Sequence, residues 1–113
     1  MATASGTTTR GSDPRIATLL QCVEACHRCA ASCLREDDVA SMTRCIALDL
    51  DCAGACELTA AMLARESDHA DAVRRLCADL CDACAEECAR HDADHCQACA
   101  RACRACAEAC RQS

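Results

Sequence analysis

The sequence predicts an all-α fold, an antiparallel up-down-up-down four-helix bundle with a cysteine-lined core, and three observations support it. Of the 113 residues, 16 are Cys and Ala is the commonest, whereas Gly contributes 3, Pro 1 and the aromatic residues none. The cysteines recur at steps of three and four residues, which keeps their side chains on one face of a helix. The breaks between helical stretches are short, and short connections favour antiparallel neighbours.

Four helices are expected, over residues 14–35, 38–65, 68–90 and 93–111. The start of the first helix is the clearest, because an Asp N-cap followed by Pro is typical of a helix N-terminus. The expected N-caps are, in order, Asp13, Asp37 or Asp38, Ser67 and Asp92. Residues 1–12 are mostly Thr, Ser, Gly and Ala and are expected to form a disordered tail ahead of one metal-binding domain over residues 13–113.

Three of the four helices carry the same cysteine pattern, with steps of four, three and four residues. The last helix has one further Cys ahead of its pattern, and the second helix has Asp49 where a fourth Cys would stand. Each helix therefore presents a stripe of thiols on one face. The stripe cysteines are Cys22, Cys26, Cys29 and Cys33; Cys45, Cys52 and Cys56; Cys77, Cys81, Cys84 and Cys88; and Cys96, Cys99, Cys103, Cys106 and Cys110.

The last helix indicates that these stripes face inward. Residues 92–113 contain no Leu, Ile, Val, Met or aromatic residue, so the stripe of Cys and Ala is the only face that this helix can bury. Thiols fill a core less favourably than Leu, by roughly 1 kcal/mol or more per residue, which favours an occupant between them. Two other uses of the thiols stay open: a core of small apolar groups, and disulfides between helices.

Metal binding is the use that the sequence favours. The first thirteen residues contain no apolar leader, so we expect a cytoplasmic protein with reduced thiols. Cu(I) suits the pattern best, because it is soft, accepts two or three thiolates and shares them between ions, so that sixteen Cys could hold on the order of 8 to 20 ions. The alternatives are an iron–sulfur, ferredoxin-like electron-transfer protein and a thiol-rich zinc or heavy-metal binding protein.

Residues outside the stripes suggest where ions enter the bundle. His91 and His95 lie at the junction of the third and fourth helices, and the topology places Asp38 and Met42 at the same end. His and Met bind Cu(I) more exchangeably than thiolate, so we predict a mouth here, the alternative being a pair of solvated loop histidines. Asp49 is expected to line the core as a ligand or a hydrogen-bond acceptor.

The remaining features limit function and partners. The net charge of −6 argues against nucleic acid, and no apolar run is long enough to span a membrane. The sequence shows no catalytic triad, phosphate loop or paired-carboxylate site, so we do not expect an enzyme. An apolar stripe on the second helix, formed by Val39, Ile46 and Leu50, is consistent with a homo-oligomer or with packing against a neighbouring helix.

Over residues 14–111 the chain resembles the family of four-helix-bundle copper storage proteins, and in particular the cytosolic branch of that family. The resemblance rests on Cys-x3-Cys-x2-Cys-x3-Cys in three helices, inward-facing cysteines and a core without aromatic residues. It implies a cytosolic store that holds many Cu(I) ions inside the bundle and assembles as a homotetramer, with a copper chaperone as a candidate partner. The expected metal ligands are the sixteen cysteines together with His91, His95, Met42 and Asp49.

Overall fold

The computed structural model describes residues 13–112, so the tail expected over residues 1–12 lies outside the described residues. This part of the chain contains four long α-helices and one short 3-10 helix, and their bounds agree with the expected ranges to within a few residues. The all-α prediction is confirmed. The elements are α2 (Pro14–Cys33), the 3-10 helix η1 (Val39–Met42), α3 (Thr43–Ala64), α4 (Ala70–Ala89) and α5 (Asp94–Arg111).

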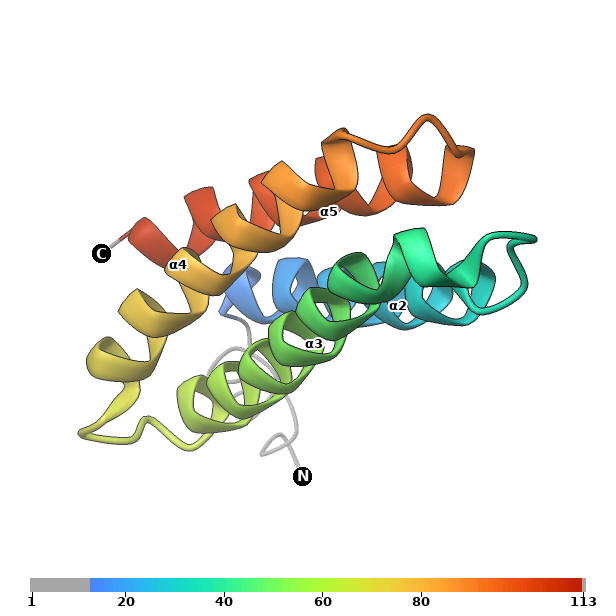
Figure 1. The fold of residues 1–113 in the computed structure, drawn as a ribbon. Coiled ribbons are helices and arrows are strands. Elements are labelled where there is room, and N and C mark those ends of the chain that lie inside the picture. The colour runs from blue at the N-terminus through green and yellow to red at the C-terminus, as the bar shows by residue number, and fades with distance from the viewer. Residues whose placement is uncertain (1–12, 113) are drawn as a thin grey trace, which may run out of the picture.

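The four α-helices form an up-down-up-down bundle (Figure 1). Helix α2 packs against α3 and α5, and α4 packs against the same two helices, so each helix lies between two antiparallel neighbours. The bundle therefore has two distinct ends. We call one the histidine end, where η1 and the α4–α5 connection lie, and the other the terminal end, where α2 begins and α5 finishes.

Side-chain caps explain the starts of α2 and η1. The Asp13 carboxylate accepts a hydrogen bond from the Arg15 backbone N–H at 2.9 Å, with Pro14 at the first helical position, as predicted. The Asp38 side chain accepts from the Ser41 N–H at 3.4 Å and caps η1 rather than α3. This extra 3-10 turn delays the start of α3 to Thr43 and buries Met42 at the histidine end.

The third and fourth caps differ from the prediction. Helix α4 begins at Ala70, and the Ser67 hydroxyl accepts from the His69 N–H at 3.1 Å in the turn before the helix. The N-cap of α5 is Ala93, so the prediction that Asp92 caps this helix is wrong. Ala93 takes an extended conformation, and its carbonyl already accepts the first backbone bonds of the helix. The helix start is therefore one residue later than the charge pattern suggested.

The core consists almost entirely of cysteine and alanine. All sixteen Cys side chains are buried, which confirms that the four stripes face the bundle axis. Larger apolar side chains occupy only its two ends, with Leu19 near the terminal end and Met42 at the histidine end. No helix within residues 13–112 has both the length and the apolarity needed to cross a bilayer.

Candidate metal centre

The sixteen thiols form one continuous group, which we call the thiol core. All of them are free, and neighbouring sulfurs lie between 3.4 Å (Cys45 to Cys88) and 4.0 Å (Cys52 to Cys56) apart. A disulfide bond is about 2.05 Å long, so these sulfurs are neighbours without a covalent link. The structure therefore does not contain the disulfide framework that the sequence left open.

Several sets of four sulfurs lie close enough to share a metal ion, with all four atoms within 4.8 Å of one another. Four of the five sets below share members with another set, so that a sulfur such as Cys52 borders two candidate sites. The sets are Cys22, Cys52, Cys56 and Cys81; Cys22, Cys26, Cys52 and Cys103; Cys26, Cys84, Cys99 and Cys103; Cys29, Cys33, Cys45 and Cys96; and Cys56, Cys77, Cys81 and Cys106. The arrangement suits a cluster of ions better than one isolated ion.

The spacing of these sulfurs fits low coordination numbers. With metal–sulfur bonds of about 2.3 Å, a trigonal site has sulfurs about 4.0 Å apart, and a linear site about 4.6 Å apart. Pairs on one helix turn lie near the trigonal value, for example 3.8 Å between Cys29 and Cys33. Pairs between helices are slightly shorter, for example 3.5 Å between Cys52 and Cys81. A trigonal site thus needs the sulfurs to move apart by only a few tenths of an ångström, whereas a linear site needs about 1 Å.

Asp49 replaces one thiol in the α3 stripe and is fully buried among cysteines of three helices. Its Oδ1 atom lies 3.2 Å from the sulfurs of both Cys84 and Cys99 and 3.5 Å from Cys88, while Oδ2 lies 3.9 Å from Cys45. Burial, followed by the charge on Cys99, raises the pKa of Asp49 to about 8. The carboxyl therefore carries a proton at neutral pH and accepts hydrogen bonds from thiols.

Burial also favours the protonated form of Cys33 and Cys96 at the histidine end. It raises the pKa of Cys33 to about 11, and it raises the pKa of Cys96 as well. Thiolate is the form that binds metal, so each ion that enters must displace protons. Loading of the thiol core is consequently coupled to proton release.

The two predicted histidines lie at the same end of the bundle, each beside a carboxylate. His91 Nε2 is 2.8 Å from Glu87 Oε2, and His95 Nε2 is 3.3 Å from Glu36 Oε2. Met42 is also buried at this end, directly before the first residue of α3. The structure thus places His91, His95 and Met42 at the same end of the bundle, as predicted from the topology.

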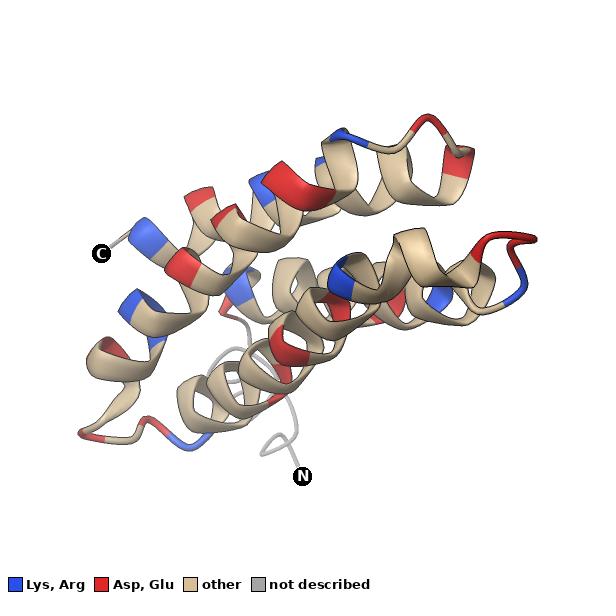
Figure 2. Ribbon diagram, in the orientation of Figure 1, with Lys and Arg blue, Asp and Glu red and all other residues tan. Residues whose placement is uncertain are grey.

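Carboxylates surround the histidine end, as the red segments of the two loops there show (Figure 2). Glu87, which was not predicted from the sequence, is nearly buried, and its Oε1 lies 3.4 Å from both Arg44 Nε of α3 and Arg90 Nη1. Glu87 therefore links α3 to α4 and also contacts His91. The spacing of four residues between Glu87 and His91 was the signal that could have identified this pair.

The terminal end of the thiol core has a different lining. Leu19, Thr59, Ala60 and Ala70 are buried there, and the Thr59 hydroxyl is occupied by a 2.7 Å hydrogen bond to the Ala55 carbonyl. These side chains are apolar or already satisfied. They close the terminal end of the thiol core with buried apolar side chains, and the Met62 and His69 side chains of this end lie outside that buried layer.

The remaining His and apolar side chains of α2 and α3 differ in burial. His27 is 54% exposed, with Nε2 3.7 Å from Glu57 Oε1. Val39 and Ile46 are half-buried, and Ile46 packs against the core, whereas Leu50 is 52% exposed. The apolar stripe on α3 is therefore divided between packing inside the bundle and an exposed surface.

A helical bundle that lines its axis with free, closely spaced thiols defines a class of multi-ion metal–thiolate protein. A family model of copper storage proteins matches residues 9–113, and the chain belongs to this family. The Bacillus subtilis cysteine-rich protein YhjQ is 43% identical over 91 residues, which cover 80% of this chain and 84% of that protein. The resemblance stated from the cysteine pattern is confirmed.

Solved structures agree with this assignment. The Cu(I)-bound copper storage protein BsCsp3 of Bacillus subtilis is 43% identical with a TM-score of 0.84, over 87% of this chain and 92% of that chain. The copper storage protein Ccsp from Streptomyces lividans, loaded with 10 copper equivalents, is 45% identical with a TM-score of 0.84, over 87% and 79% of the two chains. A cytosolic copper storage protein of the same organism, with five coppers, is 46% identical with a TM-score of 0.83, over 86% of each chain.

Proposed function

We propose that this protein is a cytosolic copper store that holds many Cu(I) ions in its thiol core and catalyses no reaction. The observation that carries the proposal is the density of the core, in which sixteen buried, free thiols include four overlapping four-sulfur sets and a fifth set at the histidine end. A store needs many equivalent sites rather than one specialised site. The relatives at 43–46% identity are named as copper storage proteins, and one of them as cytosolic.

Cu(I) fits this core better than the alternatives. It is soft and accepts two or three thiolates, and one thiolate can bridge two ions, which matches sulfurs shared between sets. Each Cu⁺ that replaces a thiol proton leaves the charge of the buried core unchanged, so the core avoids the cost of uncompensated buried charge. A Zn²⁺ ion bound by four thiolates displaces four thiol protons and so leaves a net charge of −2 at each closed site. Iron–sulfur clusters are usually wrapped by loops rather than by straight helices.

The proposed ligands are the sixteen cysteines, with Asp49, Met42, His91 and His95 in supporting roles. Asp49 touches four of the thiols and supplies an oxygen within the core. Met42 and the two histidines supply exchangeable ligands at the histidine end. The contrast with the buried apolar layer at the terminal end supports uptake through the histidine end. Copper then passes inward from His or Met to pairs of thiols on successive helix turns.

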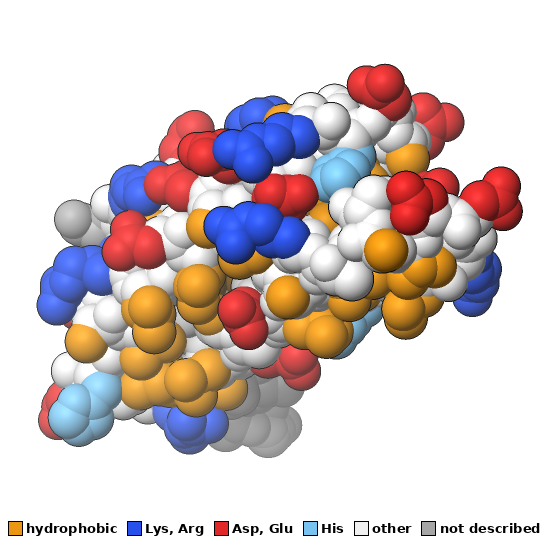
Figure 3. Space-filling model, in the orientation of Figure 1, with side chains coloured by type: hydrophobic (Ala, Val, Ile, Leu, Met, Phe, Trp, Pro, Cys, Tyr) orange, Lys and Arg blue, Asp and Glu red, His pale blue; other side chains and the backbone are white. Residues whose placement is uncertain are grey.

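We also propose that the protein assembles with copies of itself, as the homotetramer of the family resemblance. Leu50 and Leu58 of α3 and Leu76 of α4 are more than half exposed. Figure 3 shows hydrophobic side chains gathered over the later part of α3 and the first part of α4. A second copy that packs on this surface would bury them. The acidic loops of the histidine end stay available for a copper chaperone with a basic surface.

Metal selectivity tests the copper assignment. Reduced protein would be incubated anaerobically with Cu(I), with Zn(II), or with iron and sulfide, then exchanged into a weak chelator and examined by native mass spectrometry. We expect a series of masses with many Cu(I) ions that survives the exchange, in a colourless solution. Retention of one or two Zn(II) ions in preference to Cu(I), or a brown iron–sulfur species, would contradict the proposal.

A further inference from the structure

The last turn of α5 is held from outside by an arginine of another helix. Arg74, in the second turn of α4, donates from Nη1 to the carbonyl oxygens of Cys110 at 2.6 Å and Gln112 at 3.0 Å. Its Nη2 donates to Asp71 Oδ1 at 2.7 Å, which fixes the guanidinium from its own helix. The Arg74 side chain is only 13% exposed. A nearly buried guanidinium is thus used to bind the end of a helix.

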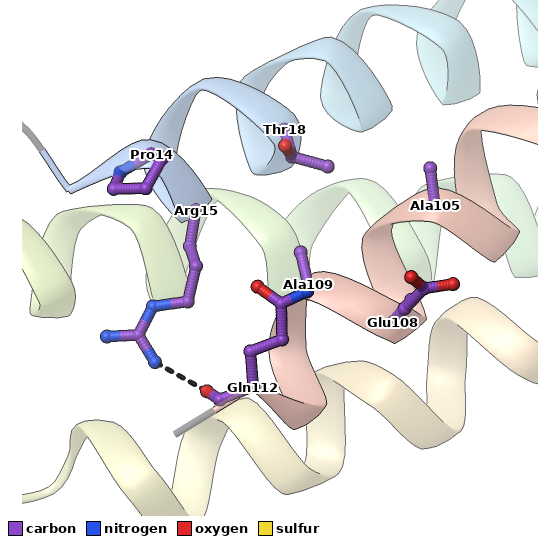
Figure 4. Close-up of a pocket in the computed structure, with 7 residues that line it drawn as sticks. All are labelled: Pro14, Arg15, Thr18, Ala105, Glu108, Ala109 and Gln112. Atoms are coloured by element: carbon purple, nitrogen blue, oxygen red, sulfur yellow. Dashed lines mark hydrogen bonds between the residues drawn. The ribbon is translucent and has the colours of Figure 1, made fainter.

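A second arginine reaches the same turn from the first helix. Arg15 Nη1 donates to the Gln112 carbonyl at 2.8 Å, as the dashed line in Figure 4 shows. The Arg15 guanidinium is held in turn by Asp13, at 2.9 Å from Nη2. Arginines of α2 and α4 therefore converge on carbonyls of α5. The last carbonyls of a helix lack hydrogen-bond partners within the helix and favour nearby cations. The two arginines therefore supply cationic donors to carbonyls at the end of α5 that the helix itself leaves unpaired.

The turn that they hold carries the last thiol of the core. Cys110 is 2% exposed, yet a surface hollow of about 380 Å³ reaches it. The hollow is lined by Arg74, Arg75, Ala78, Asp79, Cys110 and Arg111. A second hollow, of about 270 Å³, borders the other side of the same turn next to Arg15 and Gln112. Solvent thus approaches the last turn of α5 from two sides.

We propose that Arg74 is a positioning residue that closes the terminal end of the thiol core by holding Cys110 inward. It acts through the backbone of α5 rather than on copper. When its two bonds to α5 are lost, the last turn frays and the Cys110 sulfur gains access to the hollow. With the terminal end closed by Arg74, ions enter the thiol core through the histidine end. The consequence for copper rests on the proposed function, whereas the closure itself is a property of the apo protein.

Site-resolved thiol labelling of the reduced apo protein tests the closure. Wild type, Arg74→Ala, Arg74→Met and Arg74→Lys would be treated with a small alkylating reagent, and the rate at each Cys followed by mass spectrometry of peptides. Loss of charge-assisted hydrogen bonds should raise the labelling rate of Cys110 about tenfold or more in the Ala and Met variants. The Lys variant, which keeps the charge, should fall between these and wild type. The rate at Cys96, at the other end of α5, should not change.

Matched variants separate this role from general stability. Arg75 borders the same hollow without a hydrogen bond to α5, so Arg75→Ala should leave the labelling of Cys110 unchanged. Asp71→Asn weakens the hold on Arg74 while keeping the guanidinium, and should raise the rate at Cys110 by less than Arg74→Ala does. An unchanged rate at Cys110 in Arg74→Ala, or an equal rise at Cys96 and Cys110, would overturn the proposal. Neither result depends on copper.

A copper measurement then extends the test. In copper-loaded protein, Arg74→Ala should release ions to a Cu(I) chelator faster than wild type, with the same total released. If Cys110 becomes reactive in apo Arg74→Ala but neither wild type nor Arg74→Ala binds copper, the closure stands and the proposed function fails. If copper is stored and Cys110 stays protected, the closure fails and the function stands.

Discussion

The Oδ1 atom of Asp49 lies 3.2 Å from the sulfur of Cys99, inside a core that consists mostly of Cys and Ala side chains. The two residues belong to α3 and α5, so the contact crosses the bundle axis. Burial raises the pKa of this carboxyl from 3.8 to about 8. Asp49 is therefore a proton-binding group of the folded protein, and its ionisation is linked to folding.

This linkage predicts a pH dependence for the apo protein. Between pH 3.8 and about 8 the folded state keeps the Asp49 proton that the unfolded state has lost, so the free energy of unfolding falls as the pH rises through this range. The fall is on the order of a few kcal/mol, and Asp49→Asn should remove most of it. Urea unfolding of reduced protein at several pH values measures both. Parallel curves for wild type and Asp49→Asn would show that the carboxyl is not the linked group.

Copper loading should stabilise the fold strongly. Ions that bind only the folded core shift the unfolding equilibrium, and one site at a hundredfold excess over its dissociation constant adds about 2.7 kcal/mol. For a domain of this size that corresponds to roughly 10 °C or more in Tm, with further gain from each added site. Thermal unfolding followed by circular dichroism at increasing Cu(I) ratios provides the measurement. A Tm that does not move with loading would argue against a filled core.

The histidine end should control the rate of uptake rather than the capacity. His91→Ala with His95→Ala should slow Cu(I) transfer from a competing chelator, because the first exchangeable ligands are lost, while the number of ions bound at equilibrium stays the same. His27→Ala is the matched control, since His27 is exposed on the outer face of α2. Stopped-flow spectroscopy of the chelator gives the rates. An equal effect of the control, or unchanged rates in the double variant, would place the mouth elsewhere.

The exposed leucines of α3 and α4 should hold copies of the chain together. Leu58 is 51% exposed and Leu76 55% exposed, and burial of a Leu side chain contributes about 1.5–3 kcal/mol. Leu58→Glu with Leu76→Glu should therefore reduce the molar mass seen by light scattering while the helical content is kept. Leu34→Glu, at the end of α2, should leave the assembly intact. If wild type is monomeric at micromolar concentration, this surface has another role.

The fold could be predicted from sequence because a single residue type reports on every helix. Cysteines at steps of three and four mark one face, and the last helix has no other side chains to bury, so the stripe of Cys99 and Cys103 had to face inward. The position of Asp49 in the core followed from the same register. Helix lengths followed from the short breaks between stripes.

Contacts between helix ends could not be predicted in this way. The Ala93 cap depends on backbone conformation, which the neighbouring Asp92 does not determine. Asp38 was a predicted cap, but it leads into the η1 turn rather than directly into α3, and the charge pattern does not show this difference. The bonds from Arg74 to α5 join residues 36 positions apart, and no periodic pattern links them. Such contacts depend on how the four helices are offset along the axis, which is fixed only when the bundle is packed.

Anomalous scattering at the copper edge from crystals of the loaded protein tests the central claim most directly. The account predicts many copper peaks along the bundle axis, each within bonding distance of two or three sulfurs, with sulfurs such as Cys52 and Cys103 shared between ions. One or two peaks, or peaks confined to histidines and carboxylates on the surface while the thiol core stays empty, would contradict it.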